Sequence, residues 1–126
     1  MSAHQRILAA CFSASPKVRY VAAYLDGQLE LQSRADVQAL GASESDRYEE
    51  LIVNPALLTL VTQRGNIDCG GCRYVVVRYG RFYAFIYPLP NGHVTVSLEL
   101  DSALDQELEA IAAVIDRTAR RPAGQG

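Results

Sequence analysis

The sequence predicts an α+β domain in which helices pack on a five-stranded antiparallel sheet. Three observations lead to this prediction. Two strand-forming segments flank Asp26-Gly27, a dipeptide typical of a tight hairpin turn. A long segment with helical spacing of its apolar residues follows, and from Arg73 onward apolar residues recur with a period of two. The last segment returns to helical spacing after Ser102.

The first elements are a short helix and a hairpin. Over residues 2–12 the larger side chains share one helical face, and Pro16 follows soon after. These side chains are Ile7, Leu8, Cys11 and Phe12. Segments 17–25 and 28–34 are rich in strand-forming residues, so they are expected to pair across the turn.

Residues 35–68 are predicted to form a helical connection that is broken in the middle. Pro55 cannot lie inside one uninterrupted helix, because it lacks a backbone N–H and clashes with the preceding turn. We therefore expect two helices. The first begins at Ser43, with Asp46 three residues later, and the second is capped by Asn54 and ends before Gly65. Four apolar residues leave the second helix little polar face and predict that it is largely buried: Leu57, Leu58, Leu60 and Val61.

The second half is predicted to contain three antiparallel strands and a helix. Segments 73–79 and 81–87 flank Gly80, and their nearly continuous apolar content is typical of central strands covered on both faces, or of strands with one face held by a partner. Segment 93–100 alternates cleanly, which predicts one apolar face and one face in contact with water. A closing helix starts at Ser102, capped with the help of Asp105.

The domain organisation follows from length and composition. With 126 residues, 49% of them hydrophobic and 21% charged, the chain matches one globular domain. We expect this domain to span residues 1–117 and to be followed by a disordered tail over 118–126, which is rich in polar residues, Gly and Pro.

Charge and hydropathy exclude some classes of partner. The formal net charge is -2, and no basic run exceeds Arg120-Arg121, so nucleic-acid binding is not expected. No apolar segment approaches the roughly 20 residues of a membrane span, and segment 7–12 is too short for a signal peptide. The expected location is therefore the cytoplasm, without membrane contact.

The predicted order is helix, two strands, broken helical connection, three strands, helix. This order resembles that of roadblock/dynein light chain domains, and more distantly that of longin and profilin-like domains. The resemblance covers about residues 2–117 and rests on topology, because no sequence motif matches. It implies a non-catalytic protein that forms homodimers or heterodimers and serves as a platform for small GTPases, motors or larger complexes. The Cys69–Cys72 element and the long broken connection depart from it.

Catalytic patterns are missing from the sequence. His4 and His93 are the natural bases, and neither lies in a recognised motif. For His93 we expect an exposed position next to a turn. The carboxylates fall on helix starts and polar helix faces, where negative charge interacts favourably with the positive end of the helix dipole. They are Glu49, Glu50, Asp101, Asp105, Glu107 and Glu109. The sequence therefore predicts no enzyme; a hydrolase or transferase would need a concave pocket with convergent polar groups.

Cys69-Gly70-Gly71-Cys72 is the candidate chemical site. Two cysteines at this spacing can bind one metal ion, here zinc or iron, or form a reducible disulfide. A thioredoxin-like role is disfavoured, since the motif precedes a strand and does not open a helix. A metal site needs about four ligands, so Cys11, Asp68 or His93 would have to join, or a symmetric dimer would bring two pairs together. Alternatively, the cysteines only pack and the glycines only turn the chain.

Aromatic side chains crowd the strands after this element. Alternation places Tyr83, Phe85 and Tyr87 on one face and Phe82, Ala84 and Ile86 on the other. We expect the second set to pack in the core. The candidate interface consists of the first set with two further tyrosines: Tyr74, Tyr79, Tyr83, Phe85 and Tyr87.

Two functions follow from these expectations. The first is a dimerising regulatory or scaffold subunit that binds other proteins through its sheet or helix surface. The alternative is a small sensor that uses the cysteine pair for metal binding or thiol–disulfide switching.

Overall fold

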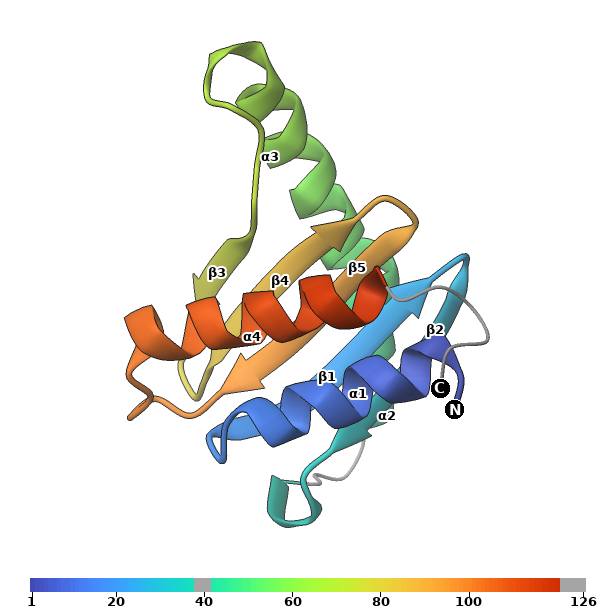
Figure 1. Ribbon diagram of the computed structural model, residues 1–126, viewed down its shortest axis with the longest axis vertical. Coiled ribbons are helices and arrows are strands. Elements are labelled where there is room, and N and C mark those ends of the chain that lie inside the picture. Colours follow the sequence, from blue (N-terminus) through green and yellow to red (C-terminus); the bar gives the residue numbers. More distant parts are fainter. Residues whose placement is uncertain (38–41, 121–126) are drawn as a thin grey trace.

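The computed structural model describes residues 1–37 and 42–120 and shows an antiparallel sheet with helices on both faces (Figure 1). Within this part of the chain the sheet has five strands in the order β2-β1-β5-β4-β3. The strands are β1 (Val18–Leu25), β2 (Gln28–Ser33), β3 (Val75–Arg78), β4 (Tyr83–Leu89) and β5 (Gly92–Leu98). The helices are α1 (Ala3–Ala14), η1 (Ala35–Val37), α2 (Ala42–Tyr48), η2 (Glu49–Val53), α3 (Asn54–Asp68) and α4 (Leu104–Ala119). The predicted α+β class and order of elements are confirmed.

Both predicted hairpins are present, but their places in the sheet differ from the prediction. β1 and β2 pair around Asp26-Gly27, and β3 and β4 pair on either side of Gly80. However, β5 is the middle strand, between β1 and β4, and β3 is an edge strand. The expectation of a central β3 was wrong because its apolar content belongs to a short strand with one open edge.

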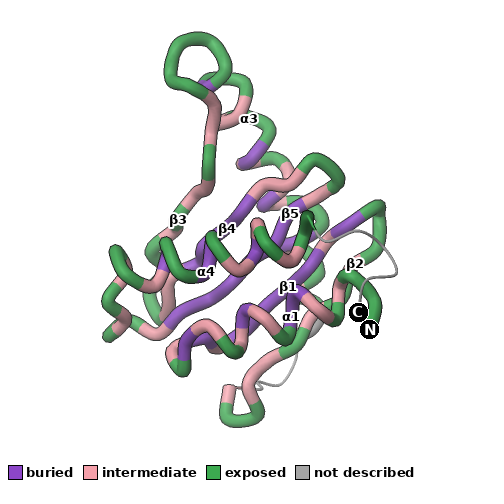
Figure 2. Tube along the Cα trace, in the orientation of Figure 1, coloured by how far each residue is buried: buried purple, intermediate pink, exposed green. Residues whose placement is uncertain are grey.

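One face of the sheet carries the apolar core. Helices α1 and α4 lie side by side across it, and Figure 2 shows buried segments on the strands beneath them. A capping box between Ser2 and Gln5 starts α1. The fully buried side chains between the layers include Ile7, Val21, Phe85, Val96, Leu98, Ile111 and Ile115. Removal of these surfaces from water is the main driving force for the fold.

The helical connection is not broken at Asn54-Pro55. Elements α2, η2 and α3 follow one another without a gap, and η2 is a π-helical turn. The N–H of Asn54 donates to the carbonyl of Glu49, five residues back, and Asn54 itself has helical backbone angles. Asn54 is therefore not the predicted cap. The wider π-helical turn accommodates Pro55, which has no backbone N–H to donate, and the helix continues.

The predicted end of the second helix before Gly65 was wrong, and the predicted cap of the first helix is not tested. Helix α3 continues past Gly65 to Asp68, and Cys69 is its C-cap. Gly65 lies inside the helix because the returning chain packs on it: a Cβ atom there would meet the Gly71 carbonyl carbon at 2.7 Å. The predicted cap by Ser43 concerns a side chain outside the described residues.

Helix α3 is less buried than predicted. It extends beyond the sheet in Figure 1, and only its first half lies over the strands. Leu58 is buried, whereas Leu60 is exposed. Apolar composition alone did not distinguish a core helix from one with an apolar surface.

The C-terminal helix begins and ends slightly later than predicted. Ala103, not Ser102, is its N-cap, and no side chain caps it. Since α4 continues to Ala119, residues 118 and 119 belong to the helix and not to the predicted tail. Residues 121–126 lie outside the described part of the chain. No helix in the described part is long and apolar enough to cross a membrane.

Candidate functional site

The second face of the sheet carries a buried polar region and is covered by the α2–η2–α3 connection. His93, Thr95 and Ser97 of β5 point to this side, and they are only 2%, 1% and 4% exposed. The alternation predicted from the sequence is correct, but the expectation of a face in contact with water was wrong. The prediction that His93 is exposed near a turn was wrong for the same reason, because the helical connection covers it.

Glu50 lies at the centre of this buried polar face and is 0% exposed. Its Oε1 accepts from Thr95 Oγ1 at 2.6 Å, from His93 Nε2 at 2.8 Å and from Asn54 Nδ2 at 3.1 Å. Its Oε2 accepts from the Tyr20 hydroxyl at 3.2 Å. We call these five residues the Glu50 cluster.

The cluster joins the helical connection to the sheet. Glu50 and Asn54 come from the π-helical turn and its end, while the other three come from β1 and β5. A buried carboxylate is costly without donors, so this helix is held where all four donors reach it. Burial and then the neighbouring charge of Glu50 raise the pKa of Tyr20, which keeps its hydroxyl group a donor.

The opposite side of the same connection carries exposed apolar side chains. Tyr48, Ile52, Leu60 and Ile67 are 62%, 56%, 66% and 76% exposed. Spacings of four, eight and seven residues place them along one side of the helical connection. We call them the apolar stripe. An exposed row of large apolar residues on one helix is typical of a protein interaction surface.

The sheet offers an open edge at β3. This strand pairs only with β4 among the described strands, and it consists of Val75, Val76, Val77 and Arg78. The other edge strand, β2, carries the polar residues Gln28, Glu30 and Gln32. Polar and charged side chains discourage edge pairing, whereas an apolar edge favours it. The two edges therefore differ, and β3 is the one suited to a partner.

Within the described residues the three cysteines are not gathered with other possible ligands into a metal-binding group. Cys11, Cys69 and Cys72 are free thiols, and the described residues contain no group of three His, Cys, Asp or Glu side chains that could hold a metal ion. Cys11 is buried under α1, and burial raises the pKa of its thiol to about 12. His93 belongs to the Glu50 cluster. Of the expected additional ligands, only Asp68 lies beside the pair.

Cys69 and Cys72 lie at the far end of α3, where their contacts differ. Cys69 is exposed, and its Sγ lies 3.3 Å from Asp68 Oδ1 and 3.4 Å from an Arg64 nitrogen. Cys72 donates to the Tyr74 carbonyl at 3.7 Å. A site formed between two copies stays a prediction, which elemental analysis and thiol titration of protein purified without reductant would test.

The aromatic residues of the predicted interface lie in different environments. Phe85 and Tyr87 are 0% and 6% exposed in the core under α1 and α4, so their surface is used within the chain. Tyr74 and Tyr83 are half-buried against that core. Tyr79 lies on the other side, where its hydroxyl donates to Glu49 at 3.0 Å.

Comparison with known proteins gives matches at the level of structure. Neither a protein-family model nor a curated protein sequence matches the chain. A roadblock/LC7 domain from Streptomyces avermitilis has a TM-score of 0.66 at 13% identity, and the match covers 90% of this chain and 92% of that one. The chain has a roadblock-like fold. The topological resemblance deduced from the sequence is thereby confirmed.

Two further structures share the roadblock-like fold. An MglB structure with a tetrameric arrangement has a TM-score of 0.69 at 8% identity, covering 94% of this chain and 91% of that one. MglC from Myxococcus xanthus has a TM-score of 0.59 at 9% identity, covering 93% and 97%. At such identities the likeness establishes the fold alone.

Sequence reasoning missed the Glu50 cluster within this roadblock-like fold. Glu50 was assigned to an exposed helix face and His93 to an exposed turn. The usable signal was the spacing of Glu50 and Asn54, four residues apart, which places two polar side chains on the same side of the helix. That spacing does not show which strand lies opposite.

Proposed function

We propose that the chain is a non-catalytic regulatory or scaffold subunit that forms a homodimer and binds other proteins. The observation that carries this proposal is the apolar stripe on a helical connection that extends beyond the sheet, together with the open edge of β3. Both are surfaces that a second copy can cover.

The stripe offers apolar surface whose burial would favour association. Burial of a large aliphatic side chain contributes about 1.5–3 kcal/mol, and Ile52, Leu60 and Ile67 are each more than half exposed in the single chain. A two-fold axis would double this contribution, because each copy presents the same residues to the other.

The β3 edge is suited to the same kind of symmetry. An antiparallel edge strand can pair with its own copy across a two-fold axis, which extends the sheet and satisfies the outward-facing backbone groups. The three consecutive valines of β3 carry no charge that would oppose this pairing.

The roadblock-like fold supports both parts of the proposal. One structure with this fold is described as having a tetrameric arrangement. Proteins of this kind serve as platforms for small GTPases or larger complexes, so the dimer proposed here would present a surface to such a partner. The cytoplasm is the proposed location.

A non-catalytic role agrees with the positions of the two histidines. His93 lies in the Glu50 cluster, 2% exposed, and would not reach a substrate. His4 contacts the backbone carbonyl of Gln28 through its Nε2 at 2.9 Å.

The test compares the oligomeric state of the wild-type chain with that of Ile52→Asp/Leu60→Asp. We expect light scattering to show a dimer for the wild type at micromolar concentration and a monomer for the double variant, because charges would be buried at the interface. The matched control is Leu100→Asp, which changes an exposed leucine outside the stripe and should remain dimeric. A monomeric wild type would remove the basis of the proposal.

A further inference from the structure

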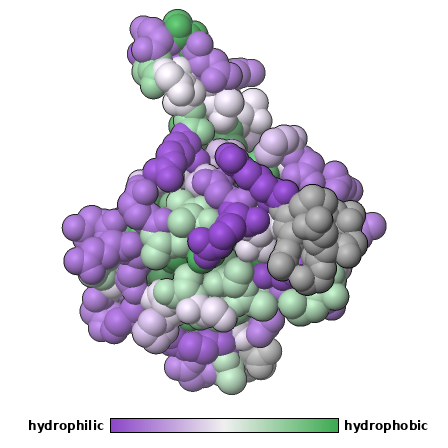
Figure 3. Space-filling model, viewed as in Figure 1, coloured by the Kyte–Doolittle hydropathy of each residue, from purple (hydrophilic) through white to green (hydrophobic). Residues whose placement is uncertain are grey.

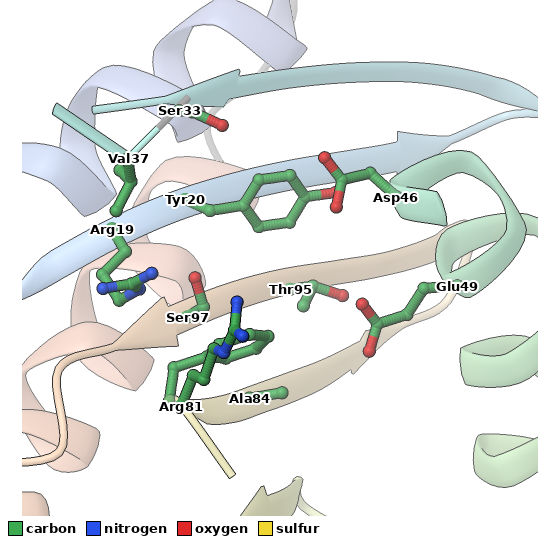
Figure 4. Close-up of a pocket in the computed structure, with 11 residues that line it drawn as sticks. Arg19, Tyr20, Ser33, Val37, Asp46, Glu49, Arg81, Ala84, Thr95 and Ser97 are labelled. Atoms are coloured by element: carbon green, nitrogen blue, oxygen red, sulfur yellow. The ribbon is translucent and has the colours of Figure 1, made fainter. Parts of the chain in front are cut away.

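A cavity of about 190 Å³ lies between the sheet and the start of the helical connection (Figure 4). It is separate from the apolar stripe, which faces outward. Its floor is formed by β1, β4 and β5, and its walls come from η1, α2, η2 and the turn between β3 and β4. Small-molecule pockets typically measure about 300–1,000 Å³ for drug-sized ligands, so this one suits a smaller molecule.

Opposite charges line opposite ends of the cavity. Figure 4 shows the guanidinium groups of Arg19 and Arg81 at one end, and the carboxyl groups of Asp46 and Glu49 at the other. The two arginines come from β1 and the β3–β4 turn, whereas the two acids come from the helical connection. A ligand in this cavity would therefore meet a positive and a negative group at the same time.

At the arginine end, one of the two guanidinium groups has no ion pair with the described residues. Arg19 is paired with Glu99 at 2.9 Å and lies over the Phe82 ring. Arg81 forms no ion pair with any residue in the described parts of the chain, and it lines the cavity. A guanidinium group in such a position is suited to hold a carboxylate through two parallel hydrogen bonds.

The acidic end has a surplus of negative charge. Burial, and secondly the charge of Glu50, raises the pKa of Asp46. Burial also raises the pKa of Glu49, against the opposite effect of its hydrogen bond from Tyr79. Three carboxyl groups thus share a partly desolvated region, and an ammonium group would stabilise their charged forms.

The floor between the two ends offers a hydroxyl group. Ser97 is 4% exposed and lines the cavity, and its hydroxyl has no hydrogen-bond partner among residues 1–37 and 42–120. The Tyr20 and Thr95 hydroxyls on the same floor are already bonded to Glu50. Ser97 is therefore a hydroxyl group of the floor that is left for a ligand.

We propose that this cavity binds a free α-amino acid. The carboxylate of the ligand would pair with Arg81 and hydrogen-bond to Ser97, and its ammonium group would lie between Asp46 and Glu49. Each charge of one small zwitterion then lies beside a protein group of opposite charge. A small or medium side chain would fit the remaining volume beside Phe82 and Ala84. This inference concerns ligand binding and does not depend on the proposed dimer.

The test titrates the full chain with each protein amino acid singly and follows the backbone amide signals of Thr95 and Ser97 by NMR. We expect saturable shifts for at least one amino acid. Its N-acetyl derivative, which lacks the positive charge, and its carboxamide, which lacks the negative charge, should each bind roughly tenfold more weakly or worse. Equal binding of either derivative would overturn the proposal, because one of the two charges of the ligand would then be unmatched.

Variants give an independent readout. Arg81→Gln and Glu49→Gln should each weaken binding of the same amino acid by roughly tenfold, because each removes one charged contact. Arg73→Gln is the matched control: Arg73 is also an exposed arginine, but it is paired with Glu109 at 3.0 Å and does not line the cavity. It should bind like the wild type. If no protein amino acid shows saturable binding up to about 10 mM, the proposal fails.

Discussion

The two faces of the sheet are built on different principles. The face under α1 and α4 is apolar and includes Phe85, Val96 and Ile111, all 0% exposed. The face under the helical connection buries Glu50 and His93 together with hydroxyl and amide groups. Figure 3 shows the side of the molecule on which α1 and α4 lie, where hydrophilic and hydrophobic residues are interspersed.

This difference separates stability from orientation. Apolar packing favours any close arrangement of similar volume, whereas a buried hydrogen-bond cluster is satisfied in one arrangement only. The α1/α4 face can therefore supply most of the folding free energy. The polar face fixes how the helical connection lies, and thereby directs the apolar stripe outward.

Phe85→Ala tests the apolar face and should have the largest effect. Truncating a fully buried phenylalanine leaves a cavity and typically costs about 3–5 kcal/mol. Phe85 also loses ring contacts with Tyr74 and Tyr87, at centroid distances of 4.9 and 5.9 Å. Urea unfolding followed by circular dichroism measures the change in the free energy of unfolding.

Val76→Ala is the control for this prediction. Val76 is paired with Phe85 across the β3–β4 ladder but is 37% exposed, so its truncation should cost much less. Similar losses for both variants would contradict the view that the α1/α4 face is the stability core.

Glu50→Ala tests the polar face and should rank second. The substitution leaves Tyr20, His93, Asn54 and Thr95 with fewer partners while still buried, and each unpaired donor costs about 1–3 kcal/mol before relaxation. We expect a loss of about 2–4 kcal/mol in the same assay. Entry of water into the vacated space would place the loss at the lower end.

Two variants sharpen the comparison. Glu50→Gln keeps a carbonyl acceptor and the side-chain shape, so it should lose less than Glu50→Ala. Glu30→Ala removes an exposed glutamate from β2 and should change stability little. A Glu50→Ala variant as stable as Glu30→Ala would show that the cluster contributes nothing to holding the helix.

Local sequence signals predicted the elements themselves. Asp26-Gly27 predicted the first hairpin because Asp26 and Gly27 both adopt the positive φ angles that its turn requires. The alternation over β5 predicted which of its residues share a face. The order of these elements was sufficient to suggest the roadblock-like fold.

Features that depend on which elements pack against each other could not be predicted from the sequence. The burial of His93 is decided by a helix more than thirty residues earlier in the chain, namely by Glu50 and its turn. Pro55 predicted a break, but the π-helical hydrogen bond from Asn54 to Glu49 absorbs it. Likewise, the three valines of β3 look central in sequence, and only the strand order shows that they lie at an edge.

The smallest predicted effect concerns pH. The carboxyl pKa values of Asp46 and Glu49 are raised in the folded state above their ordinary values of 3.8 and 4.5, chiefly by burial. Between the ordinary and the raised values the folded state binds more protons than the unfolded state. The contribution of these two groups to stability therefore decreases as pH rises through that window. Asp46→Asn/Glu49→Gln should remove this decrease, as measured by urea unfolding at successive pH values.

Glu99→Gln provides a control of opposite sign on the same face. Hydrogen bonds from Arg34 and Arg19 lower the pKa of Glu99 below its ordinary value of 4.5, so its contribution is present above that value and is lost as pH falls. Glu99→Gln should therefore lose less stability than the wild type as pH falls below 4.5. Asp46→Asn/Glu49→Gln should lose less stability than the wild type as pH rises above the ordinary carboxyl pKa values. If the free energy of unfolding of the double variant changed with pH above 4.5 as it does in the wild type, burial at the acidic end of the cavity would not disfavour the charged carboxylates. The polar face would then differ from the apolar face in its hydrogen bonds alone.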